Sequence, residues 1–118
     1  MLIDWGQLDQ FREFDDEALS MTRGVLMLVV GETPQRIDDI RAALASYDSA
    51  ALSRATHVLK GAASNAGAAA LSKASSVLEQ SCQQGQWPAG AYAQVERLTV
   101  LASATCQSLK SWTAAQTF

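Results

Sequence analysis

Apolar and small side chains recur at alternating steps of four and three residues over the last quarter of the chain. The positions are Ala91, Val95, Leu98, Ala102, Thr105, Leu109 and Trp112. Because an α-helix has 3.6 residues per turn, this spacing draws one stripe along one side of a helix of about six turns. A stripe of that length is buried only against other long helices. The pattern therefore predicts a helical bundle.

Five further segments with helical periodicity precede this one. We expect a short helix over residues 3–14 and longer ones over 15–30, 34–48, 50–66 and about 71–85. Gly31 should end the second segment and Thr33-Pro34 should start the third, since a hydroxyl followed by proline is typical of a helix start. Short connections make consecutive helices antiparallel neighbours. The expected fold is all-α, one domain over 1–118: an antiparallel up-and-down four-helix bundle with a short additional N-terminal helix.

Composition excludes several classes of protein. The net charge is −3 and the basic residues are scattered, whereas nucleic-acid binding needs a basic stripe. No apolar run approaches the roughly 20 residues that cross a bilayer, and the N-terminus lacks the pattern of a secretory signal. Cys82 and Cys106 have no second ligand at metal-binding spacing, so we expect reduced cysteines and no metal site. A cytoplasmic, free-standing and monomeric protein is the expectation.

The one histidine of the chain, His57, lies on the segment over 50–66. On a helical wheel it stands opposite the apolar stripe of that segment, formed by Leu52, Ala55, Leu59, Ala62 and Ala66. The imidazole should therefore point away from the core. The same exposed face carries Ser53, Arg54, Lys60, Gly61 and Ser64.

Two neighbours favour a phosphoryl acceptor over an idle surface histidine. Lys60, one turn after His57, can pair with a phosphoryl group held on the ring. Gly61 costs a helix about 1 kcal/mol relative to alanine, in a chain rich in alanine. The wheel places it away from the core, so the hypothesis is that it leaves room for a partner to close over His57. A neutral imidazole is a suitable nucleophile near neutral pH.

The chain lacks the other parts of a phosphotransfer enzyme. There is no phosphate-binding glycine loop, no Walker-type lysine motif and no cluster of metal-binding acids. No cofactor of its own is expected, and Mg²⁺ and the phosphorylated aspartate should come from the partner. The sequence thus predicts a phosphocarrier without kinase machinery, and leaves open whether it counts as an enzyme.

The stretch from Ala55 to Gly67, ATHVLKGAASNAG, resembles the signature of histidine-containing phosphotransfer (HPt) domains. That signature is H-x-x-K-G, two small residues, and a second glycine ten residues after the histidine. The similarity covers about residues 4–85, and Ala66 departs from it where a larger apolar residue is usual. The resemblance implies a helical-bundle relay between hybrid sensor kinases and response-regulator receiver domains. It also implies that His57 carries the phosphoryl group, Lys60 supports it and Gly61 permits the receiver to approach.

Further expectations and alternatives concern partners. The apolar segment from Val25 to Val30 exceeds what one buried face needs, so Met27 and Val30 are candidate docking residues together with Ser53, Arg54 and Ser64. Full burial of this segment under the N-terminal helix is the equally favoured alternative. A histidine-kinase dimerisation domain is less consistent with Val58 after the histidine, and a chemotaxis-kinase phosphoacceptor domain would share the pattern. The alternative from another class is a non-catalytic helical adaptor that binds receivers without phosphotransfer.

Overall fold

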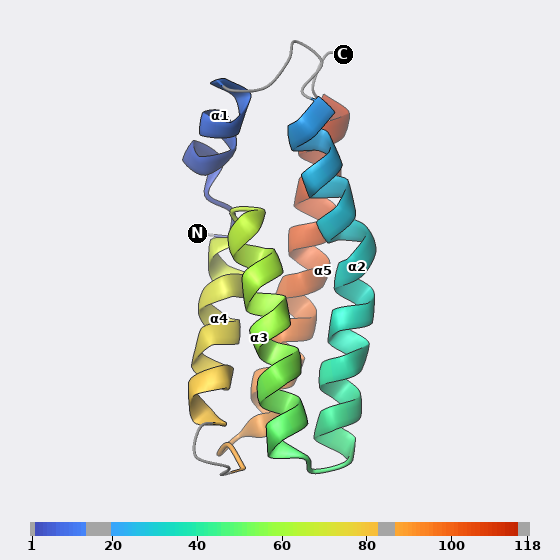
Figure 1. The fold of residues 1–118 in the computed structure, drawn as a ribbon, viewed down its shortest axis with the longest axis vertical. Helices are drawn as coiled ribbons and strands as arrows, with labels where there is room; N and C mark the ends of the chain where they lie inside the picture. The colour runs from blue at the N-terminus through green and yellow to red at the C-terminus, as the bar shows by residue number, and fades with distance from the viewer. Residues whose placement is uncertain (1, 14–19, 83–86, 116–118) are drawn as a thin grey trace.

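The computed structural model describes residues 2–13, 20–82 and 87–115, and these form five helices (Figure 1). The helices are α1 (Trp5–Glu13), α2 (Ser20–Ala45), α3 (Ser49–Asn65), α4 (Ala69–Ser81) and α5 (Ala91–Ala115). The described residues contain no strand. The all-α class predicted from the sequence is confirmed.

Helices α2 to α5 form an up-and-down bundle in which each packs against two others: α2 on α3 and α5, α4 on α3 and α5. The molecule is elongated, with extents of 48 × 20 × 19 Å. Helices α2 and α5 extend beyond α3 and α4 at the end where α1 lies (Figure 1). One core cluster fills the four-helix part, and a smaller one, which includes Leu8, Leu26 and Leu109, lies under α1.

The predicted break between residues 30 and 34 is wrong, because α2 runs without interruption through Gly31 and Pro34. Proline within a helix removes one backbone hydrogen bond. Burial of the same helix side before and after it, by Val30 and by Ile37, offsets that loss. The Thr33 hydroxyl, expected to cap a new helix, instead donates to the carbonyl oxygen of Val29 at 2.6 Å. The segments predicted over 15–30 and 34–48 therefore contribute to one helix, which the structure describes from Ser20 to Ala45.

The other predicted helices are confirmed, with small shifts of their ends. At the start of α1, the side chain of Asp4 accepts a hydrogen bond from the backbone N–H of Gln7 at 3.1 Å. At the start of α3, the side chain of Asp48 accepts one from the backbone N–H of Ala51 at 3.0 Å. Six of the seven α5 stripe positions are buried, and Trp112 is half-buried and stacked on Trp5. The ends predicted at 14, 15 and 85 lie outside the described residues. Both cysteines are free.

Gly67 shapes the turn between α3 and α4. Its φ of +70° lies in the left-handed region, and the carbonyl oxygen of Asp4 would lie 3.2 Å from an added Cβ. The same turn holds the start of the chain, since the Asp4 amide donates to the Gly67 carbonyl and the Ala70 amide donates to the Leu2 carbonyl. The second glycine of the signature thus has a structural role: it lets α1 dock on the end of the α3–α4 hairpin.

Replacing Gly67 with alanine should destabilise the fold by roughly 1–2 kcal/mol, because alanine is strained at positive φ and its Cβ crowds the Asp4 carbonyl. Denaturant unfolding of the variant beside the native protein measures the loss. Gly90 also has a positive φ, of +66°, but an added Cβ there meets nothing within 4 Å. Gly90→Ala therefore isolates the backbone strain, and an equal loss in both variants would show that the contact with Asp4 contributes nothing.

Candidate functional site

His57 projects from the outer face of α3, with 67% of its side chain exposed. On the opposite face, Leu52 and Leu59 are fully buried. The buried side is centred slightly off the predicted stripe: Thr56 is fully buried, and its hydroxyl donates to the Leu52 carbonyl at 2.6 Å. Satisfying the hydroxyl within its own helix allows a polar residue in the core. His57 thus stands on a rigid helix and faces outward, as expected.

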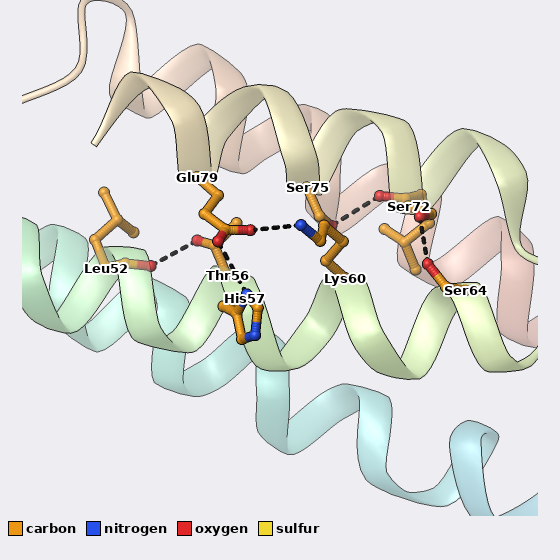
Figure 2. Close-up of polar contacts among 9 residues, drawn as sticks. Leu52, Thr56, His57, Lys60, Ser64, Ser72, Ser75 and Glu79 are labelled. Carbon is orange, nitrogen blue, oxygen red and sulfur yellow. Dashed lines mark hydrogen bonds and ion pairs between the residues drawn. The ribbon is translucent and has the colours of Figure 1, made fainter. Parts of the chain in front are cut away.

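Glu79 of α4 orients the imidazole ring. Its Oε1 lies 2.9 Å from Nδ1 of His57, and only 18% of its side chain is exposed (Figure 2). Burial raises the pKa of Glu79, but the hydrogen bond from His57 and the ion pair with Lys60 outweigh burial and hold the pKa below the ordinary 4.5. An ionised carboxylate only accepts hydrogen bonds, so Nδ1 carries the ring proton. The lone pair of the neutral imidazole is then on Nε2, which points away from Glu79 in Figure 2.

Lys60 is held by the same carboxylate. Its Nζ lies 3.2 Å from Oε2 of Glu79, and its side chain is 35% exposed. The lysine therefore leans toward α4 rather than standing beside the ring (Figure 2). One carboxylate thus joins the histidine and the lysine into a single network. One turn further along α3, the Ser64 hydroxyl lies 2.7 Å from that of Ser72.

Gly61 is exposed, and a Cβ built on it would meet no atom within 4 Å. Packing among the described residues therefore gives no reason for a glycine at this helical position. The open space lies on the face of His57, one turn away.

The predicted docking residues divide into two groups. Ser53, Arg54 and Ser64 lie on α3 around His57, half-buried in the first case and exposed in the others. Val30 is 7% exposed within the core cluster under α1, so its prediction as a surface residue is wrong. Because every residue from Val25 to Val30 is apolar, the sequence did not indicate which side of α2 faces the core. Met27 is 43% exposed, but it precedes Pro34 by two turns, and Pro34 lines a groove toward α5. It therefore lies on the side of α2 away from α3.

Glu79 is the site residue that the sequence analysis missed. The signal was the geometry of the hairpin: His57 and Glu79 each stand eleven residues from Ala68 (68 − 57 = 11; 79 − 68 = 11). In an antiparallel pair of helices, positions equidistant from the turn lie at the same level. Among the described residues, no group of three or more His, Cys, Asp or Glu could hold a metal ion. No helix in that part of the chain is long and apolar enough to cross a membrane.

Comparisons with known proteins give one fold and one family. The crystal structure of histidine-containing phosphotransfer protein B (HptB) from Pseudomonas aeruginosa PAO1 superposes with a TM-score of 0.86, covering 98% of this chain and 97% of that one at 24% identity. No curated protein matches the sequence. The family model of the Hpt domain matches residues 24–112, which include all of α3 and α4. The chain therefore belongs to the Hpt domain family and is a histidine phosphotransfer protein of the phosphorelay type.

Proposed function

We propose that His57 is the phosphoacceptor and that it relays a phosphoryl group between the receiver aspartates of a hybrid sensor kinase and a response regulator. The observation that carries the proposal is the hydrogen bond from Nδ1 of His57 to Glu79, which leaves the nucleophilic Nε2 facing outward. A half-exposed helix face suits a nucleophile that must enter a partner's active site. Family membership supplies the class of reaction.

Transfer in this proposal exchanges one bond for another. Nε2 of His57 attacks the phosphorus of an aspartyl phosphate in line, the P–O bond to the aspartate breaks, and the carboxylate leaves. The same steps in reverse pass the group to the second receiver. As Nε2 attacks, positive charge develops on the ring, and the Glu79 carboxylate 2.9 Å from Nδ1 stabilises it. The receivers supply Mg²⁺, and Lys60, held on the same Glu79 carboxylate as the ring, supplies positive charge one helical turn from His57.

In this proposal Gly61 leaves room for the receiver to approach His57. Side chains added at Gly61 should therefore have opposite effects on the stability of the fold and on the rate of transfer. Gly61→Ala should stabilise the fold by about 0.5–1 kcal/mol, because glycine disfavours a helix and the added Cβ meets nothing. Gly61→Leu should fold normally and slow transfer by about tenfold or more, because its side chain fills the approach to His57. Unfolding curves and transfer rates measure the two effects.

The matched control is Gly31, an exposed helical glycine of α2 whose Cβ would also meet no atom. Gly31→Leu should transfer at the native rate. Equal rates for the two leucine variants would argue against clearance at Gly61.

The function itself is tested with labelled partners. The native protein is mixed with a panel of phosphorylated receiver domains and with autophosphorylated hybrid kinases, and label on the protein is followed over time. We expect label that is stable in base and labile in acid, as a phosphoramidate is. The fastest donor identifies the pathway and the direction of flow. Tight binding of receivers without any label would instead establish the non-catalytic adaptor.

A further inference from the structure

A groove of about 450 Å³ runs between α2 and α3 beside His57. Its walls are mainly small, formed by Ala42, Ala43, Ser46, Ala51 and Ala55. Four larger side chains border it: Arg36 and Asp39 of α2, and Arg54 and Val58 of α3. Val58 directly follows His57 and is 45% exposed. The groove thus combines a shallow apolar floor with two guanidinium groups and one carboxylate, next to the proposed phosphoacceptor.

The two arginines are available to a partner. Arg54 is exposed and forms no ion pair or hydrogen bond within the described part of the chain. Arg36 is half-buried and lies 3.8 Å from Glu32 and 3.9 Å from Asp39, and such long contacts between partly exposed groups contribute little. A guanidinium group binds carboxylates with two parallel hydrogen bonds. With two arginines against one aspartate, the groove carries an excess of positive charge in a chain whose net charge is −3, and it therefore favours an acidic partner.

A second groove, between α2 and α5, is larger at about 580 Å³ but fits a transfer partner less well. None of its lining residues belongs to α3 or α4, so it does not adjoin His57. It carries one charge of each sign, Asp38 and Lys110, and so selects neither an acidic nor a basic partner. Between the two grooves, position and charge favour the one beside His57.

We propose that the α2–α3 groove binds a segment of the receiver domain that presents an aliphatic side chain next to a carboxylate. The proposal rests on the proposed function and names the surface that recognises its partner. The aliphatic group packs on the alanines and Val58, and the carboxylate pairs with Arg54 and Arg36. Because Arg54 precedes His57 by three residues, this ion pair forms one helical turn from the phosphoacceptor. It fixes the orientation in which the aspartyl phosphate meets Nε2.

The test is the dependence of transfer on receiver concentration, using the receiver that donates fastest in the panel. Arg54→Glu should raise the apparent KM by about tenfold or more, leave the saturating rate unchanged and reduce the sensitivity to salt. Arg97→Glu makes the same charge change at an exposed position of α5 and should transfer like the native protein. Filling the groove with Ala42→Phe should also raise the KM, whereas Ala104→Phe, at an exposed alanine of α5, should not.

Three outcomes would overturn the proposal. Equal KM values for the Arg54 and Arg97 variants would exclude the ion pair, and native transfer by Ala42→Phe would exclude the groove. A fall in the saturating rate at unchanged KM would assign Arg54 to the chemical step instead. Failure of the proposed function is detected separately, because label would then appear on the His57→Gln variant.

Discussion

Replacing His57 with glutamine is expected to reduce phosphoryl uptake from any donor by at least about 1,000-fold, to below detection. The amide can replace one hydrogen bond of the imidazole, but it has no lone pair able to displace an aspartyl carboxylate. Because the His57 side chain is 67% exposed and opposite the core, the free energy of unfolding should change by less than about 0.5 kcal/mol. Label transfer and denaturant unfolding measure the two quantities on the same preparation.

The control for this substitution is binding. The variant should still bind receivers with native affinity, because it keeps Arg54, Gly61 and the surface around them. Label on the variant that remains stable in base would show that another residue accepts the phosphoryl group, and would overturn the assignment of His57.

Replacing Glu79 with alanine is expected to slow transfer by about 100-fold while leaving receiver binding intact. The variant loses the acceptor that fixes the proton on Nδ1 and the negative charge that stabilises the ring during attack. It also frees Lys60, whose Nζ lies 3.2 Å from Glu79. The effect should fall on the saturating rate and not on KM.

Glu79→Gln separates orientation from charge. The glutamine side chain keeps an oxygen that accepts from Nδ1, so the ring stays oriented, but the charge is gone. We expect its rate to lie between those of the native protein and Glu79→Ala. Since the pKa of Glu79 is held below its ordinary value, the carboxylate is ionised near neutral pH, and the comparison there measures the loss of a full negative charge. Native rates in both variants would restrict Glu79 to a structural role.

Most of the fold and part of the site were predictable because they depend on local periodicity. The stripe on α5 and the outward position of His57 follow from helical spacing alone. The continuity of α2 through Pro34 does not follow from helical spacing. The start signal at Thr33-Pro34 is local, whereas the burial that keeps α2 continuous comes from packing against other helices. Glu79 was missed for a similar reason: its role depends on the register between two helices, which no single helix records.

The turn at Gly67 also determines which changes of length the chain tolerates. His57 and Glu79 meet because the connection between α3 and α4 sets both at one level, and each added or removed residue would turn one helix by about 100° and slide it by about 1.5 Å. A single insertion or deletion between Asn65 and Ala69 should therefore separate the histidine from its carboxylate, even in a chain that still folds. Relatives that preserve this network are expected to keep the 22-residue spacing between His57 and Glu79 while their other loops vary in length.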